Sequence, residues 1–224
     1  MIGIDVSHWQ GVIDWVKVVE AVDFAIIKCT QGVDIPDAYY KRNLYDAGAL
    51  KFPRGPYHFF EPIPDGTKQA EYFYDHMVDQ SLNVLAGDFE WGAPGVISNI
   101  EKFVKRLNVL TGKMPWIYTN ANFWNTYIGP ANPDWAAECP RWISNPSLST
   151  APYLPKAWNS YELWQYSWTG VVAGISGSVD LNRPRDGFDV LQAFGNGEAG
   201  DIVLPDGLQF EALVDGQNVR TGPG

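Results

Sequence analysis

Apolar residues along the chain fall into short continuous runs, separated by longer segments in which apolar residues recur at helical spacing. Continuous runs are typical of parallel strands that are covered on both faces. Eight runs predict strands, at Ile2–Val6, Phe24–Lys28, Gly55–Phe59, Val84–Glu90, Trp116–Thr119, Trp142–Ser144, Leu163–Tyr166 and Val179–Asn182.

The gaps between the first six strands carry amphipathic patterns that predict helices. These lie at Ile13–Val22, Ala38–Ala49, Thr67–Val78, Ile97–Leu110 and Asn122–Ile128. After the sixth strand the gaps shorten and lose helical character, whereas a full crossover between parallel strands needs a dozen or more residues. The pattern therefore predicts an α/β fold: an irregular barrel of five β/α units followed by three strands joined mostly by loops.

The chain divides into a barrel over residues 1–194 and a different C-terminal segment over residues 195–224. We expect Phe188–Phe194 to close the barrel as a last helical turn. The glycine-rich stretch that begins at Gly195 has the composition of a linker. The alternative is a native tail that packs along the barrel, because short terminal segments with apolar residues often dock.

Composition excludes several classes of protein. The 224 residues are 46% hydrophobic and 19% charged, as in ordinary globular domains. The formal net charge of −10, without a run of Lys and Arg, argues against a nucleic-acid partner. The apolar runs are too short to span a bilayer, so we expect no membrane partner. The N-terminus lacks the pattern of a signal peptide, so we expect a cytoplasmic protein until release, unless a leader has been removed.

The sulfur and imidazole groups do not form a metal or disulfide pattern. Cys29 and Cys139 lie 110 residues apart, and we expect both to be buried free thiols. The three histidines have no metal-ligand spacing, so we expect no metal and no cofactor. The ten tryptophans are either core residues or platforms on which sugars stack.

Acidic residues fall where the predicted strands end. In a parallel barrel the active site lies at the carboxyl ends of the strands. Asp5 ends the first strand, Asp88 and Glu90 end the fourth, and Asp180 lies in the eighth. Alternation along a strand points Asp88 and Glu90 to the same side, so one of the two should have a raised pKa. Cleavage of a glycosidic bond needs such an acid and a second group that stabilises the sugar cation.

Other interpretations of these acids stay open on the residues alone. A single Asp at a strand end is commonly a cap or a loop anchor, and an Asp-x-Glu triplet is common by chance. Four acids at one mouth could also bind a divalent metal, although no histidine accompanies them.

The ordered motifs resemble those of glycoside hydrolase family 25, the N,O-diacetylmuramidases of bacteriophages and bacteria. The resemblance covers residues 1–194. Its pieces are Gly3-Ile-Asp5-Val-Ser7-His8-Trp9-Gln10-Gly11, Phe24-Ala-Ile-Ile-Lys28-Cys-Thr30-Gln31-Gly32, Gly55-Pro-Tyr57-His58-Phe59, Asp88-Phe-Glu90, Trp116-Ile-Tyr118-Thr-Asn120, Leu163-Trp164-Gln165-Tyr166-Ser167 and Val179-Asp180-Leu181-Asn182.

The resemblance implies a flattened barrel and hydrolysis of the β-1,4 bond from N-acetylmuramic acid to N-acetylglucosamine in peptidoglycan. Glu90 would be the proton donor, and Asp88 would stabilise the substrate's 2-acetamido group as it attacks the anomeric carbon. Asp5 and Asp180 would complete the acidic floor. Four residues would bind substrate along the groove: Tyr57, Tyr118, Gln165 and Asn120.

Two other functions remain as alternatives, a chitinase-like hydrolase of another N-acetylated glycan and a carbohydrate-binding barrel without activity. The C-terminal residues 208–224 resemble the start of a bacterial Src-homology-3-like wall-binding module, through the segment Asn218-Val-Arg-Thr-Gly-Pro-Gly224. We expect a monomer that acts at the bacterial cell wall, with peptidoglycan as its partner.

Overall fold

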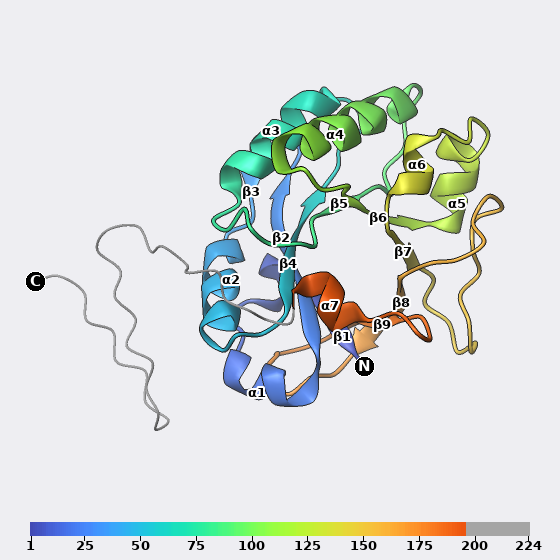
Figure 1. Cartoon of the computed structure of the whole chain (residues 1–224). Coiled ribbons are helices and arrows are strands. Elements are labelled where there is room, and N and C mark those ends of the chain that lie inside the picture. The colour runs from blue at the N-terminus through green and yellow to red at the C-terminus, as the bar shows by residue number, and fades with distance from the viewer. Residues whose placement is uncertain (196–224) are drawn as a thin grey trace, which may run out of the picture.

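The computed structural model describes residues 1–195, in which nine strands form one sheet that closes into a barrel. Figure 1 shows the strands at the centre and the larger helices outside them. The strands are β1 Gly3–Val6, β2 Phe24–Gln31, β3 Ile35–Pro36, β4 Arg54–Phe59, β5 Ala86–Asp88, β6 Trp116–Asn120, β7 Arg141–Ser144, β8 Leu163–Gly170 and β9 Val179–Pro184.

The strand order is β1-β9-β8-β7-β6-β5-β4-β2-β3, and pairing of β1 with β2 closes the barrel. Seven of the barrel strands run in the same direction, whereas β9 runs the opposite way and is antiparallel to both β1 and β8. The link between β8 and β9 is too short for a crossover, so β9 must turn back. The predicted barrel of five β/α units and three further strands is confirmed. The two-residue strand β3, antiparallel to the end of β2, was not predicted.

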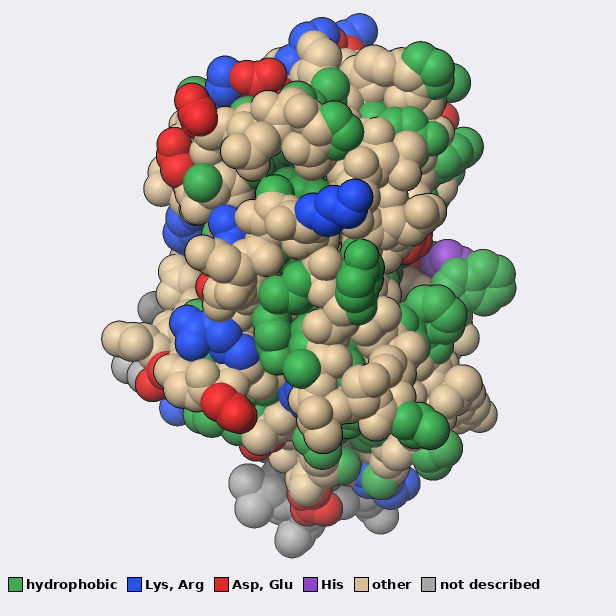
Figure 2. Space-filling model, turned by 90° about the vertical axis from the view of Figure 1, so that its right-hand side faces the viewer, with side chains coloured by type: hydrophobic (Ala, Val, Ile, Leu, Met, Phe, Trp, Pro, Cys, Tyr) green, Lys and Arg blue, Asp and Glu red, His purple; other side chains and the backbone are tan. Residues whose placement is uncertain are grey.

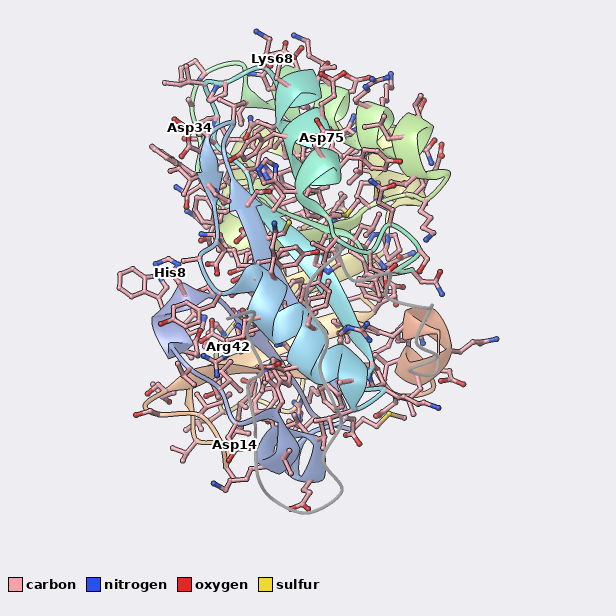
Figure 3. The ribbon with its side chains drawn as sticks, turned by 90° about the vertical axis from the view of Figure 1, so that its left-hand side faces the viewer. His8, Asp14, Asp34, Arg42, Lys68 and Asp75 are labelled. Atoms are coloured by element: carbon pink, nitrogen blue, oxygen red, sulfur yellow. The ribbon has the colours of Figure 1, made fainter. Side chains whose placement is uncertain are left out.

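Helices follow the first five barrel strands and cover the outside of the barrel. Figure 3 shows α2, which carries Arg42, and α3, which carries Lys68 and Asp75, on one side of the strands. The helical elements are η1 His8–Gln10, α1 Trp15–Ala21, α2 Tyr40–Ala49, α3 Gly66–His76, α4 Val96–Thr111, α5 Ala121–Phe123, η2 Trp124–Ile128, α6 Trp135–Glu138 and α7 Val190–Phe194.

Two apolar clusters explain why the strands are continuous apolar runs. On β2, Ala25 and Ile27 pack outward beneath the helices, while Phe24 and Ile26 belong to a second cluster. The second cluster also includes Trp116 of β6 and residues of α7. Both faces of the strand are therefore removed from water, and alternation of polar and apolar residues is lost.

The last helix packs against the ends at which strands begin. The Phe194 ring lies 5.2 Å from the ring of Phe24 and 6.4 Å from that of Trp116, centroid to centroid. Each of these two partners is the first residue of its strand. The amino ends of the strands are therefore covered by α7, as the predicted closing turn at Phe188–Phe194 requires.

Several surface and chemical features complete the fold. Cys29 and Cys139 are free and buried, as predicted. Within residues 1–195, the helices are all too short or too polar to cross a membrane. Exposed apolar side chains are distributed over the face in Figure 2 and are not gathered in one patch. The predicted linker and wall-binding module at 196–224 lie outside the described residues.

Candidate active site

A pocket of about 170 Å³ opens at the carboxyl ends of the parallel strands. The structure brings the four predicted acids together there. The lining residues are Asp5, Ser7, Trp9, Lys28, Tyr57, Phe59, Asp88, Glu90, Tyr118, Trp142 and Asp180.

The triplet Asp88-Phe89-Glu90 places two acids on one side of the chain. Strand β5 ends at Asp88, two residues earlier than predicted, so Glu90 is not a strand residue. Extended pairing nevertheless continues through Phe89, whose N–H donates to the carbonyl of Tyr118 at 2.8 Å and whose carbonyl accepts from the Thr119 hydroxyl at 2.7 Å. The Phe89 ring is buried in the outer core, and both acids line the pocket.

The two acids of the triplet have different surroundings. Asp88 is buried, and burial followed by the charge of Glu90 raises its pKa well above the usual value, against an opposing effect of Lys28. Its Oδ1 atom is buried without a hydrogen-bond partner among the described residues. The Glu90 side chain reaches solvent. The pKa of Glu90 is nevertheless raised. The main cause is desolvation by the surrounding residues of the pocket, and the charge of Asp5 adds to it.

Asp5 and Asp180 form the second acidic pair. They lie directly opposite each other in the antiparallel β1–β9 register. Asp180 stands near the start of its strand, and it reaches the mouth of the barrel because β9 runs backwards. Burial raises the pKa of Asp5 to about 6, and burial together with the charges of Asp5 and Glu90 raises that of Asp180 to about 7.

The predicted substrate-binding residues fall into two groups. Tyr57 and Tyr118 line the pocket. Gln165 is buried beneath it and bonded to other side chains. The Asn120 side chain accepts from the N–H of Phe123 at 2.9 Å and caps α5. Neither amide is among the lining residues, so their predicted contact with substrate has no support from this geometry.

Residues without an assigned role in the sequence analysis also line the pocket. The Lys28 ammonium donates to Gln31 Oε1 at 3.0 Å and lies 4.8 Å from the Phe59 ring centroid. Lys28 and Ser7 both lie at the end of a predicted strand, and this position could have identified them as residues of the site. Trp142 lies within a strand, and nothing in its sequence position separates it from a core residue.

Most of the ten tryptophans are core residues, which confirms one of the two interpretations for them. Three are exposed: Trp9 at 81%, Trp91 at 51% and Trp168 at 59%. Trp9 lines the pocket and Trp91 follows Glu90 directly. Beside Trp9, His8 projects at the edge of the view in Figure 3 and is bonded through Nδ1 to Asp37 at 2.9 Å. These exposed rings are available for stacking on a sugar.

The acids do not have the arrangement of a metal centre. Across residues 1–195, His, Cys, Asp and Glu side chains do not gather in groups of three or more that could hold a metal ion. Oδ2 of Asp5 accepts from the amides of Asn182 and Gln165, at 2.7 and 3.0 Å. The site can thus supply proton donors, proton acceptors and fixed negative charge.

Comparison with known proteins gives a consistent result. The chain is 37% identical over 213 residues to Lysozyme M1 of Streptomyces globisporus, covering 88% of this chain and 72% of that protein. It is 29% identical over 201 residues to the N,O-diacetylmuramidase of Chalaropsis sp, covering 80% and 95%. The structure of the bacterial lysozyme from Streptomyces coelicolor superposes with a TM-score of 0.79 at 34% identity, over 88% of this chain and 98% of that one.

Residues 4–175 match the family described as glycosyl hydrolases family 25. This match spans every strand that carries a pocket residue except β9, and the similarity to Lysozyme M1 extends over most of the chain. The chain therefore belongs to glycosyl hydrolases family 25 and is a glycoside hydrolase.

Proposed function

We propose that the protein hydrolyses the β-1,4 bond between N-acetylmuramic acid and N-acetylglucosamine in bacterial peptidoglycan. Relatives named lysozyme and N,O-diacetylmuramidase support this substrate. The observation that carries the mechanism is the pairing of a buried Asp88, with one unpartnered oxygen, and a solvent-accessible Glu90 in the same pocket.

Access to solvent divides the roles of the two acids. Glu90 can reach a glycosidic oxygen in a glycan bound over the pocket, and donates the proton that the leaving oxygen requires. Asp88 lies too deep for that contact. Its free Oδ1 suits the amide N–H of the 2-acetamido group, which is the substrate's own nucleophile.

Charge development during the reaction links the two roles. As the acetamido oxygen attacks the anomeric carbon, the bond from that carbon to the leaving oxygen breaks and the acetamido group becomes cationic. The positive charge on the acetamido group favours the ionised form of Asp88. The negative charge of Asp88 in turn favours the protonated form of Glu90, until Glu90 passes its proton to the leaving oxygen. Ionised Glu90 then takes a proton from water, which attacks the same carbon and restores the acetamido group. Two displacements give retention at the anomeric carbon.

Product analysis of a peptidoglycan digest tests the proposal. Purified peptidoglycan is digested, the new reducing ends are reduced, and the reduced sugar is identified by mass spectrometry. We expect reduced N-acetylmuramic acid, with unchanged yield in EDTA. Reduced N-acetylglucosamine, or cleavage of chitin alone, would support a chitinase-like hydrolase, and an absence of products would support a binding barrel.

The Glu90→Gln variant tests the acid in the same assay. Loss of a general acid lowers the rate by roughly a hundredfold to ten-thousandfold, while the melting temperature should not fall, because the side chain is exposed and its charge is disfavoured in the fold. The matched control is Glu138→Gln, at an exposed position of α6 that does not line this pocket. A Glu90→Gln variant that keeps more than about a tenth of the activity contradicts the role.

A further inference from the structure

Gln165 of β8 joins residues of five strands at the floor of the site. Its side chain is 1% exposed. The amide nitrogen Nε2 donates to Oδ2 of Asp5 at 3.0 Å and to Oδ2 of Asp180 at 3.2 Å. Both hydrogens of the amide are thereby used on the second acidic pair.

The oxygen end of the same amide is held from the other side. Oε1 accepts from the Tyr118 hydroxyl at 2.9 Å, the Ser144 hydroxyl at 2.7 Å and the indole N–H of Trp168 at 2.9 Å. An indole N–H can only donate, so the atom that faces it must be the amide oxygen. The orientation that directs the NH₂ group at the two acids is therefore fixed by its surroundings.

The two acids need such a donor because of their register. Asp5 and Asp180 are directly opposed on adjacent antiparallel strands, where like charges destabilise the pair. A second amide contributes to one of them only: Asn182 Nδ2 donates to Asp5 Oδ2 at 2.7 Å, while its own oxygen accepts from the Trp142 indole at 2.7 Å. Gln165 is the side chain bonded to both acids among the described residues.

We propose that Gln165 is a positioning residue, which holds Asp5 and Asp180 in a fixed arrangement through its amide and does not itself contact substrate. This role rests on the proposed function, because only there do the two acids take part in catalysis. A groove-lining role does not fit a side chain that is 1% exposed and whose polar atoms are all bonded within the protein.

Removing the amide has a defined electrostatic consequence. The hydrogen bond from Gln165 lowers the pKa of Asp5 against the larger, opposing effect of burial. Without it, the pair should ionise at higher pH. Other titratable groups also face the pair, from β2, β4, the end of β5 and β6. They are Lys28, Tyr57, Asp88, Glu90 and Tyr118. A substitution of Gln165 leaves all five unchanged.

The test compares Gln165→Met with Gln192→Met, which makes the same chemical change at an exposed position of α7, beyond the opposite end of the barrel. Carboxyl resonances of protein labelled with ¹³C at aspartate are followed by NMR against pH, without substrate. We expect the titrations of Asp5 and Asp180, assigned from the Asp5→Asn and Asp180→Asn variants, to move to higher pH in Gln165→Met only. Gln165→Leu, which also lacks the donating amide and adds no charge, replaces it if the Met variant does not fold, and should move them in the same direction.

Kinetics on peptidoglycan provide the second readout. Misplaced acids should lower kcat by about tenfold to a hundredfold, with KM changed by less than about threefold. Unchanged aspartate titrations with only a lower melting temperature would reduce Gln165 to a packing residue and overturn the proposal. A raised KM at unchanged kcat would make it a substrate contact, which also overturns it. If the wild-type protein cleaves no peptidoglycan, the proposed function fails, whereas the NMR comparison still decides the role of Gln165.

Discussion

Each carboxyl group of the pocket has a pKa raised above its ordinary value, and the causes differ from residue to residue. Burial is the largest cause for all four, and charge from a neighbouring acid adds to it for Asp88, Glu90 and Asp180. Lys28 opposes the effect at the two acids of the triplet. Such perturbed groups are characteristic of sites that move protons, and each can be tested by a single substitution.

Asp88→Asn should damage turnover more than affinity. The acetamido group becomes charged only along the reaction path, so the lost interaction belongs to the transition state. In single-turnover measurements, we expect the rate constant of the chemical step to fall by about a hundredfold to a thousandfold. The affinity for substrate should change less. Asp75→Asn on the exposed face of α3 is the control. Unchanged single-turnover rates with weaker binding would transfer the role to Asp5 or Asp180.

Asp180→Asn should stabilise the protein at neutral and alkaline pH. Its pKa is raised from 3.8 to about 7 in the fold. The folded state therefore favours the protonated acid, and that contribution to stability is present below pH about 4 and lost as pH rises through about 7. Thermal melts should show a higher Tm for the variant at pH 8, by roughly 2–4 °C for each kcal/mol relieved, and no difference at pH 4. A gain that is independent of pH, or one shared by Asp75→Asn, would contradict the assignment.

At the scale of elements, close contacts between backbones set the positions of helices around the barrel. Helix α3 begins at Gly66. The carboxylate of Asp65 caps its N-terminus by accepting from the backbone N–H of Thr67 at 2.9 Å. A Cβ atom at Gly66 would overlap the backbone carbonyl oxygen of Asn99 in α4. Backbone cannot rotate away as a side chain can, so the two helices must separate to admit it.

Gly66→Ala should therefore destabilise the fold. Overpacking costs roughly 1–3 kcal/mol, which corresponds to a Tm lower by about 2–4 °C per kcal/mol. Lys68→Ala, at an exposed position of the same helix, should change Tm little. Equal effects of the two substitutions in thermal melts would show that α3 and α4 can part freely.

The sequence predicts the barrel well because its strands are buried on both faces and its early gaps have helical periodicity. The direction of β9 could not be predicted, since periodicity in a strand is the same in both directions. The end of β5 was misplaced because Phe89 continues the apolar pattern, and its backbone is still bonded to β6, beyond the end of the strand at Asp88. The acids were found from their strand-end positions. The buried role of Gln165 was not, because it depends on contacts with Asp5, 160 residues away.

At the scale of the whole molecule, net charge affects how the protein meets its proposed substrate. The chain carries a formal charge of −10. Many bacterial walls are anionic, so a body of this charge is repelled at long range. The range of that repulsion is about 30 Å at 0.01 M salt and about 8 Å at 0.15 M.

Lysis of walls rich in anionic polymer should therefore be faster at about 0.15 M than at about 0.01 M sodium chloride. Peptidoglycan from which the anionic polymer has been extracted should be digested with a weaker salt dependence. Initial rates on the two substrates measure the difference. Faster lysis of the anionic walls at the lower salt concentration would mean that local attraction outweighs the net charge.

The position of α7 has a practical consequence for attaching the protein to a support. Phe194 packs on residues with which strands begin, and β1 begins at Gly3. Met1 and Gly195 thus lie toward the end of the barrel remote from the pocket. A bead or electrode coupled through an N-terminal tag lies at the end of the barrel where the strands begin, and the pocket with its four acids faces the solution. Oriented immobilisation should preserve access to insoluble wall fragments, whereas random coupling through the exposed lysines would turn the pocket toward the support in part of the molecules.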